Sequence, residues 1–234
     1  MLTNKHKQIE ALRLSAAVAS GQTSGDPIYR LFEKVAGKYS VTGDLLDFGA
    51  GKGELASRMQ KLFSITTITC IDMLKAPTGI PSSIRWDAAD LNEKTSYEDR
   101  SFDVIMAAEV IEHLENPRAT MREWFRLLKP GGYVIFSTPN NQSVRSILAL
   151  AFRGHFQAFG DESYPAHITA LLQKDIQRIA KEAGLELLDF HYTNHGIIPK
   201  TRLSWQSLTG GLLGGKMFSD NVLAVCKKIS LGMS

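Results

Sequence analysis

The sequence has little cysteine, no long apolar run and no dense block of one charge, and each shortage excludes a class of protein. Its two cysteines, Cys70 and Cys226, each lie in an apolar stretch, which predicts buried thiols in a reducing compartment and argues against a disulfide or metal pair. No apolar run approaches the roughly 20 residues that a membrane-spanning helix needs. The polar N-terminus carries no secretion signal, so we expect a cytoplasmic protein.

The charge balance argues against nucleic acid as a partner. The formal net charge is +3 over 234 residues, an excess too small to indicate a nucleic-acid surface. Hydrophobic residues make up 44% of the chain and charged residues 22%, which is ordinary for a soluble globular protein. The length suffices for one well-buried α/β domain.

Strand and helix patterns alternate along most of the chain. Helices are expected over residues 5–20, from Asp26 onward, and over 117–128 and 172–183. Apolar, β-branched stretches predict strands at 44–48, 65–71, 84–87, 103–108, 132–137, 185–193 and 220–228. Such alternation implies a mostly parallel sheet with helices on both faces, and the last two strands should form an antiparallel pair. The segments 139–170 and 195–219 are insertions in this alternation.

A glycine-rich turn follows the first predicted strand. Gly49, Gly51 and Gly53 stand at alternate positions just after Asp47 and Phe48. This spacing differs from the Gly-x-Gly-x-x-Gly of dinucleotide-binding proteins, and the absence of a following Gly-Lys-Ser/Thr excludes a P-loop. The glycines would let a nucleotide cofactor approach the backbone closely. The alternative is a tight turn without a ligand.

Acidic residues follow three further predicted strands, at the sheet edge where ligands bind in doubly wound folds. Asp72 comes about 20 residues after the glycine turn, the spacing at which an acid accepts hydrogen bonds from a ribose. Asp90 lies past the next strand and is a candidate to hold an adenine amino group. Glu109 follows a strand expected beside the first one, so it should face the reaction centre. Solvated or helix-capping acids are the alternatives.

Taken together, these elements resemble the class I S-adenosylmethionine-dependent methyltransferases, from about Gly43 to Cys226. The resemblance rests on Leu-Leu-Asp-Phe-Gly-Ala-Gly-Lys-Gly, the later Asp72, Asp-Ala-Ala-Asp-Leu, Glu-Val-Ile-Glu-His-Leu, and Leu-Leu-Lys-Pro-Gly-Gly-Tyr-Val-Ile-Phe-Ser-Thr-Pro-Asn, in this order. The layout is most similar to ubiquinone-pathway and polysaccharide-cluster O-methyltransferases. It implies a Rossmann-like α/β fold: a seven-stranded, mostly parallel sheet with the last strand antiparallel and helices on both faces.

The resemblance also implies S-adenosyl-L-methionine as methyl donor and S-adenosyl-L-homocysteine as product. By the family pattern, the methionine part of the donor would contact Asp47, Gly49, Ala50 and Gly51, and the ribose would bind Asp72. The adenine would contact Met73, Asp90 and Leu91, and Glu109 would lie near the sulfonium. The sequence departs from the family pattern at one place, just after Met73. Residues 74–81 contain two prolines and a glycine, which exclude the family's usual helix, so we expect a loop on the adenine side.

A hydroxyl acceptor requires a base, and histidine is the usual base near neutral pH. We take His113 and His167 as the catalytic candidates, with His155 as a further candidate. His191 and His195 lie on or just past a late strand and are weaker candidates.

The same region offers a candidate metal site. Two carboxylates and imidazole would suit Mg²⁺ or Mn²⁺, and the set comprises Glu109, Glu112, His113 and His167. The arrangement resembles ubiquinone-pathway O-methyltransferases and small-RNA 2′-O-methyltransferases. The alternative is that His113 begins a helix and no metal binds.

We expect residues 1–40 to form N-terminal helices over the cofactor site, and residues 41–234 to form a methyltransferase domain with an acceptor-side insertion at about 140–170. The apolar segment 146–152, with Phe156, Phe159 and Tyr164, is either a lid or acceptor pocket or simple packing onto the domain. The apolar segment 210–218 predicts a surface hairpin, with a peripheral membrane contact or a dimer partner as alternatives. The protein would be a monomer or a homodimer.

The predicted function is methylation of a small molecule, most simply O-methylation of a sugar, a phenol or a lipid-linked precursor. One alternative is an RNA ribose 2′-O-methyltransferase, against which the near-neutral charge counts. The other is a non-catalytic S-adenosylmethionine-binding protein, against which the intact glycine turn and the candidate bases count.

Overall fold

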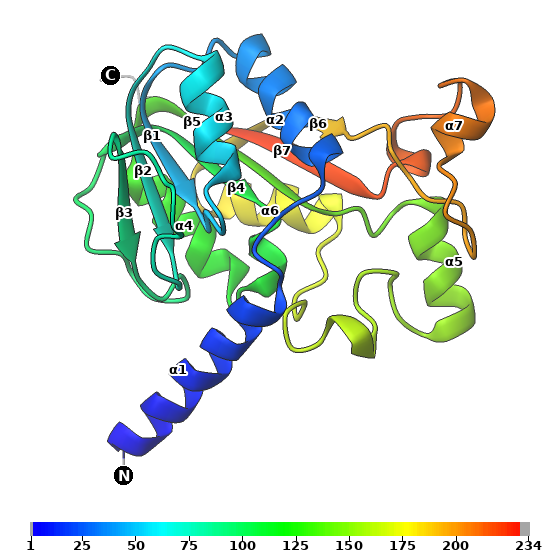
Figure 1. Ribbon diagram of the computed structural model, residues 1–234, viewed down its shortest axis with the longest axis horizontal. Helices are drawn as coiled ribbons and strands as arrows, with labels where there is room; N and C mark the ends of the chain where they lie inside the picture. Colours follow the sequence, from blue (N-terminus) through cyan, green and yellow to red (C-terminus); the bar gives the residue numbers. More distant parts are fainter. Residues whose placement is uncertain (1, 230–234) are drawn as a thin grey trace.

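A seven-stranded sheet forms the centre of the computed structural model, which describes residues 2–229 (Figure 1). The strand order is β3-β2-β1-β4-β5-β7-β6, and β7 alone runs opposite to the other six strands. The strands are β1 (Gly43–Phe48), β2 (Ile65–Asp72), β3 (Ile84–Ala88), β4 (Phe102–Ala108), β5 (Leu128–Pro139), β6 (Leu185–Tyr192) and β7 (Asn221–Lys228). The predicted sheet, including its antiparallel last strand, is confirmed.

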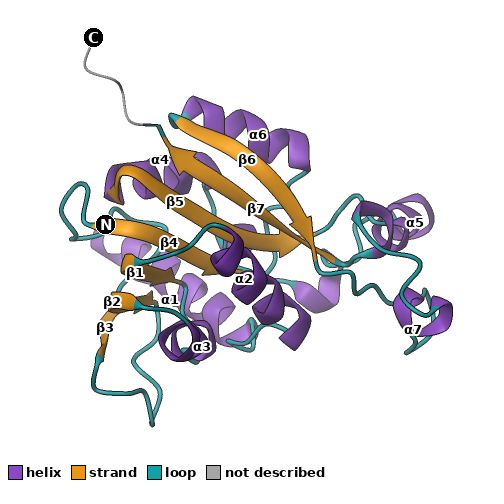
Figure 2. Cartoon of the chain, turned by 90° about the horizontal axis from the view of Figure 1, so that it is seen from above, coloured by secondary structure: helices purple, strands orange, loops and turns teal. Residues whose placement is uncertain are grey.

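Helices cover both faces of this sheet, as Figure 2 shows. On one face lie α2 (Asp26–Lys38) and α3 (Glu54–Leu62); on the other lie α4 (Pro117–Leu127) and α6 (Gln173–Glu182). Because side chains alternate along a strand, neighbouring residues of β1 enter different cores: Leu45 packs with the first pair of helices and Leu46 with the second. This two-sided burial explains why the strands are apolar without a polar alternation.

Three helices lie outside these two layers. The first, α1 (Leu2–Ala19), extends away from the sheet, whereas α5 (Val144–Arg153) and α7 (Trp205–Thr209) lie together beyond one end of it (Figures 1 and 2). Single 3-10 turns complete the chain at Ile111–His113, Asp161–Ser163 and Lys216–Phe218. None of the helices within residues 2–229 is both long and apolar enough to cross a membrane.

Several local predictions differ from the structure. Strand β5 begins at Leu128, earlier than expected, because Leu128 pairs with Phe102 before a register shift. His113 ends a 3-10 turn and does not begin a helix. The segment 210–218 is not a hairpin: it follows the short helix α7 and ends in a 3-10 turn. The N-terminal helix spans residues 2–19, not 5–20. The predicted loop after Asp72 is confirmed, since no helix lies between β2 and β3.

Candidate functional site

A cavity of about 440 Å³ lies at the carboxyl ends of β1, β2 and β4. Every residue predicted to contact a cofactor lines it, and so do both predicted catalytic histidines. These lining residues are Asp47, Gly49, Ala50, Gly51, Asp72, Met73, Asp90, Leu91, Glu109, His113 and His167. They meet because parallel strands end at one edge of a sheet, where doubly wound folds bind their ligands. We call this space the first cavity.

The glycine turn between β1 and α3 forms one wall of the first cavity. Gly51 has a φ of +55°, and a Cβ there would overlap the backbone carbonyl of Gln22. That carbonyl accepts a hydrogen bond from the amide of Lys52 at 3.1 Å, so the turn is closed against the segment that joins α1 to α2. Gly49, at a φ of +80°, leaves room for the side chain of Val110. These glycines are therefore required by close approach as well as by backbone conformation.

Two buried carboxylates flank the turn. Asp72 accepts the amide of Gly51 on Oδ2 at 2.8 Å and the amide of Leu74 on Oδ1 at 2.9 Å. Asp47 is 1% exposed and accepts the amide of Ala56 at 3.1 Å. Burial, reinforced by the charge of Asp72, raises the pKa of Asp47 to about 7. Burial also raises the pKa of Asp72, against the amide hydrogen bonds that lower it.

Asp90, the acid predicted to contact the adenine, forms an ion pair with the N-terminal helix. Arg13 of α1 donates to Asp90 at 2.6 Å and to Glu93 at 2.9 Å, and it binds both carboxylate oxygens of Glu115 at 2.9 and 2.8 Å. Its side chain is only 17% exposed despite lying on a projecting helix. Arg13 thereby ties α1 to the rim of the first cavity.

Glu109 lies at the end of β4 in a left-handed conformation, with a φ of +57°. Its carboxylate accepts the hydroxyl of Ser137 and the amide of Asn221, both at 2.8 Å, so residues from β4, β5 and β7 are joined there. Burial and the nearby charge of Glu112 raise the pKa of Glu109 well above its ordinary value. Glu109 therefore faces the first cavity with its carboxyl group fixed by hydrogen bonds and with its ionised form disfavoured.

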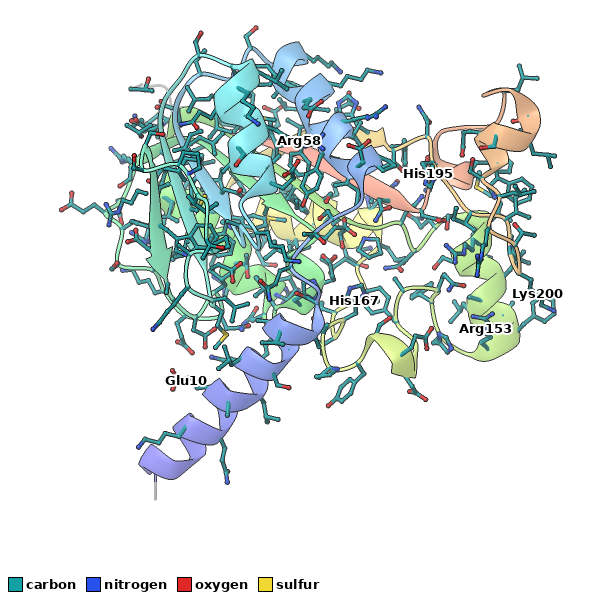
Figure 3. All side chains as sticks on the ribbon, viewed as in Figure 1. Glu10, Arg58, Arg153, His167, His195 and Lys200 are labelled. Carbon is teal, nitrogen blue, oxygen red and sulfur yellow. The ribbon has the colours of Figure 1, made fainter. Side chains whose placement is uncertain are left out.

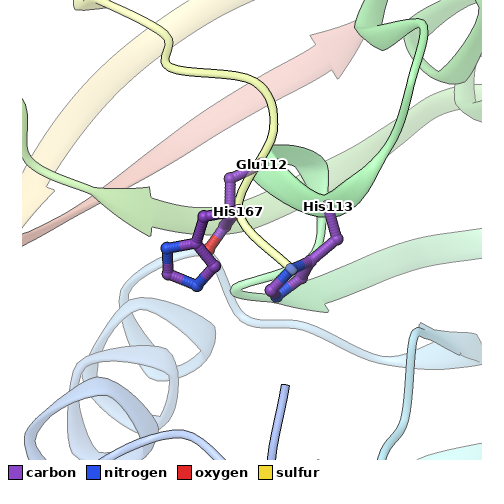
Figure 4. Close-up of side chains that lie close together, drawn as sticks. All are labelled: Glu112, His113 and His167. Atoms are coloured by element: carbon purple, nitrogen blue, oxygen red, sulfur yellow. The ribbon is translucent and has the colours of Figure 1, made fainter. Parts of the chain in front are cut away.

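Glu112, His113 and His167 lie close together (Figure 4), and one ligand atom of each falls within 4.8 Å of the others. The predicted metal set also included Glu109, which is outside this group. Glu112 is fully buried, and neither carboxylate oxygen has a hydrogen-bond partner among the described residues. Its burial raises its pKa to about 8; the hydroxyl of Thr138 acts in the opposite direction without reaching full hydrogen-bond geometry.

Both imidazoles are oriented by backbone carbonyls. Nδ1 of His113 lies 2.8 Å from the carbonyl of Ala166, and Nδ1 of His167 lies 2.6 Å from that of Ala158. A neutral imidazole must donate at Nδ1 to satisfy such a contact, which leaves the Nε2 lone pair free. Burial lowers the pKa of both rings, and His113 lowers that of His167 further. Each is therefore available as a neutral base at pH 7.

The sequence matches a family model described as a methyltransferase domain, over residues 22–189. This match covers more than half of the chain. The chain belongs to this methyltransferase family. The resemblance to class I S-adenosylmethionine-dependent methyltransferases is thus confirmed at the level of the family.

Individual relatives of the methyltransferase domain agree with this assignment. Ubiquinone biosynthesis O-methyltransferases from Thiobacillus denitrificans and Neisseria meningitidis are 26% and 27% identical, over 61% and 67% of this chain. The matches span 64% of the first relative, which is under two thirds, and 69% of the second. A solved structure of 1,6-didemethyltoxoflavin-N1-methyltransferase from Burkholderia thailandensis has a TM-score of 0.65 at 13% identity, covering 96% of this chain and 90% of its own. At this identity the structural likeness shows the fold alone.

Sequence reasoning placed the N-terminal region over the cofactor site, but it did not single out the residues of that region, or Asn221, that line the methyltransferase's first cavity. Arg13 and the segment 20–29 come from the N-terminal region, and Asn221 comes from the start of β7. His195, which we ranked as a weaker candidate, also lines the cavity. Figure 3 labels His195 and His167 on the ribbon. His155 does not line it; its Nδ1 lies 3.0 Å from the carbonyl of Phe156.

Proposed function

We propose that this protein transfers a methyl group from S-adenosyl-L-methionine to a hydroxyl group of a small molecule. The observation that carries the proposal is the first cavity, in which a glycine-rich backbone turn adjoins two buried carboxylates and two neutral imidazoles. The relatives named O-methyltransferases support oxygen as the acceptor atom. Residues 1–40 would cover the donor, since Arg13 and residues 20–29 line the cavity.

The lining residues fit this donor chemically. Each oxygen of Asp72 accepts one amide hydrogen and keeps lone-pair capacity for the hydroxyl groups of a ribose. The turn from Gly49 to Gly51 would hold the amino-acid part, while Asp90 and Leu91 would contact the adenine. When bound, the donor supplies an electrophilic methyl group on a positively charged sulfur. Glu109 would lie near that charge, which favours its ionised form.

The acceptor side requires a group that removes a proton. His167 and His113 each present a free Nε2 lone pair, and both are neutral near pH 7 for the reasons given above. A base in this position would take the proton of the acceptor hydroxyl as the oxygen is methylated. The carbonyls of Ala166 and Ala158 hold the rings in the tautomer that this step needs.

A divalent ion would replace this base: Nδ1 of each ring faces a carbonyl, so an ion would bind the same Nε2 atoms, and it would itself lower the pKa of the acceptor hydroxyl. Glu112, His113 and His167 provide one carboxylate and two imidazoles, and the unpartnered oxygens of Glu112 would gain a counter-charge from an ion. With Glu109 outside the group, this set suits Mn²⁺ better than Mg²⁺, which prefers oxygen ligands. We expect Mn²⁺, but not Mg²⁺, to raise the thermal midpoint of the wild type and not that of Glu112→Gln. Equal midpoints with and without Mn²⁺ would exclude the ion.

Two experiments test the main proposal in sequence. Calorimetry should detect binding of S-adenosylhomocysteine, and the absence of binding at millimolar concentration would refute the donor assignment. A methyl-transfer screen over sugars, phenols and small RNAs should then yield an O-methylated small molecule. Methylation of RNA alone would favour the ribose alternative, and binding without any transfer would favour a non-catalytic protein.

A further inference from the structure

A second cavity of about 180 Å³ adjoins the first. The two share Glu109, His167 and Asn221, so the second cavity opens on the side where we place the base and the reacting methyl group. Its remaining walls come from the loop after β5, from helix α5 and from the segment that follows this helix. These segments belong to the insertion expected on the acceptor side.

Most of the residues that line the second cavity have polar side chains. Of the lining residues, only Pro139 and Ala158 are apolar; the others are Glu109, Asn140, Asn141, Ser143, Arg145, Ser146, Gln157, His167, Asp220 and Asn221. No aromatic side chain is among the residues that line this cavity, so it offers an aromatic acceptor no ring to stack on. This cavity instead offers amides and hydroxyl groups.

Two of these polar groups lack partners. Asn141 is 3% exposed and donates its Nδ2 to the carbonyl of Leu171, but its buried Oδ1 has no hydrogen-bond partner in the described part of the chain. The side-chain amide of Gln157 likewise makes none of the hydrogen bonds found among residues 2–229, although its backbone amide donates to Ser146. A buried acceptor left unpaired costs about 1–3 kcal/mol, so the Oδ1 of Asn141 favours a ligand that supplies a hydroxyl donor. Gln157 is only half-buried, and its amide is open to a second hydroxyl group.

The rest of the cavity wall is fixed and nearly neutral. Asn140 donates to the carbonyls of Lys216 and Ser219 at 2.7 and 2.8 Å, which anchors the loop after β5. Arg145 pairs with Asp220 at 2.8 Å. An anionic acceptor group would have to compete with Asp220 for this guanidinium, so the wall favours a neutral polar molecule over a phosphate or a carboxylate.

We propose that the second cavity binds the hydroxyl groups next to the methylated one, so that the acceptor is a neutral polyhydroxylated ring such as a sugar. Asn141 and Gln157 bind these neighbouring hydroxyl groups, while His167 and Glu109 face the reacting one. The inference rests on the proposed methyl transfer and narrows its acceptor from sugars, phenols and lipid-linked precursors to sugars. A phenol has no neighbouring hydroxyl group for the Oδ1 of Asn141 or for the amide of Gln157.

The test compares two kinds of acceptor and two matched variants. Methyl glucoside and methyl mannoside are assayed against phenol and p-cresol with the wild type, Gln157→Leu and Gln177→Leu. Gln177 lies on α6 and lines neither cavity; among residues 2–229 its side chain forms a hydrogen bond only with that of Lys174. We expect glycoside turnover in the wild type and about a tenfold rise in KM in Gln157→Leu, since a site built for hydroxyl groups discriminates through them. The Gln177→Leu variant should stay within about twofold of the wild type.

Binding measurements separate the possible failures. Saturation-transfer NMR of the protein loaded with S-adenosylhomocysteine should detect methyl glucoside and not phenol. Preferred methylation of phenol, no glycoside binding, or an unchanged KM in Gln157→Leu would each overturn the sugar assignment while leaving the methyltransferase intact. Failure to bind S-adenosylhomocysteine would overturn the proposed function itself.

Discussion

Replacing Asp47 by asparagine should stabilise this protein, and the gain should grow with pH. Asp47 is buried beside the glycine turn, and its pKa rises from 3.8 to about 7 on folding. At about 1.4 kcal/mol per pH unit, this rise corresponds to about 4 kcal/mol of free energy that folding must supply to keep the ionised form buried. The Asp47→Asn variant retains an oxygen for the amide of Ala56 and removes the charge.

The sign follows from the protons bound in each state. Below about pH 4 the carboxyl group is protonated both folded and unfolded, so the charge imposes no cost. Between about pH 4 and pH 7 the folded state holds a proton that the unfolded state releases, so wild-type stability falls as the pH rises. Above pH 7 the cost is complete. The variant lacks this dependence, so its advantage should grow by about 4 kcal/mol between pH 4 and pH 8.

Urea unfolding of both proteins at pH 5, 6.5 and 8 measures this difference. Asp44→Asn is the matched control on the same strand, because Lys129 lowers the pKa of Asp44 and its replacement should destabilise the protein. A variant-minus-wild-type difference that stays constant with pH would refute the reasoning, since it would mean that Asp47 titrates normally in the folded state.

Three further predictions concern the glycine turn, the base and the N-terminal helix. Gly51→Ala should lower stability by more than about 1 kcal/mol and abolish binding of S-adenosylhomocysteine in calorimetry, whereas Gly79→Ala, which meets no atom within 4 Å, should be milder and keep binding. His167→Gln should lower kcat by about 10²-fold or more. Because the pKa of His167 is lowered, wild-type activity should persist below pH 6.5. A pH–rate profile in which activity already falls at or above pH 6.5 on acidification would contradict His167 as the base. Arg13→Gln removes contacts that together contribute roughly 1–2 kcal/mol, so amide hydrogen exchange at residues 10–19 should become about 5- to 30-fold faster. Unchanged exchange rates would show that Arg13 does not hold α1 against the rim of the first cavity.

The sheet and the donor side of the site could be predicted because they depend on local patterns. Strand ends can be read from apolar runs, and parallel strands bring their ends to one edge whatever the loops do. Asp47, Asp72 and Glu109 therefore reached one cavity as expected, although their contacts with a bound donor stay a prediction.

The remaining parts of the site depend on long-range contacts. Nothing in the sequence around Arg13 shows that it pairs with Asp90. A single arginine in α1 belongs to no repeating pattern from which such a contact could be predicted. Asn221 reaches Glu109 only because β7 is antiparallel, which brings the first residue of this strand to the edge where its neighbours end. The second cavity likewise forms only when residues 139–158 fold back onto the sheet. The apolar residues of this segment dominate its sequence pattern, so Asn141 and Gln157 were not recognised as lining residues.

The position of β7 in the sheet also sets the order in which this protein can mature during synthesis. Strands β1 to β5 and the glycine turn leave the ribosome well before Asn221, and β6 pairs with no strand other than β7 in the described sheet. A nascent chain can thus build the parallel core early, yet Glu109 lacks its amide donor until the last strand enters between β5 and β6. The wall shared by the two cavities is consequently completed only after Asn221 has been synthesised.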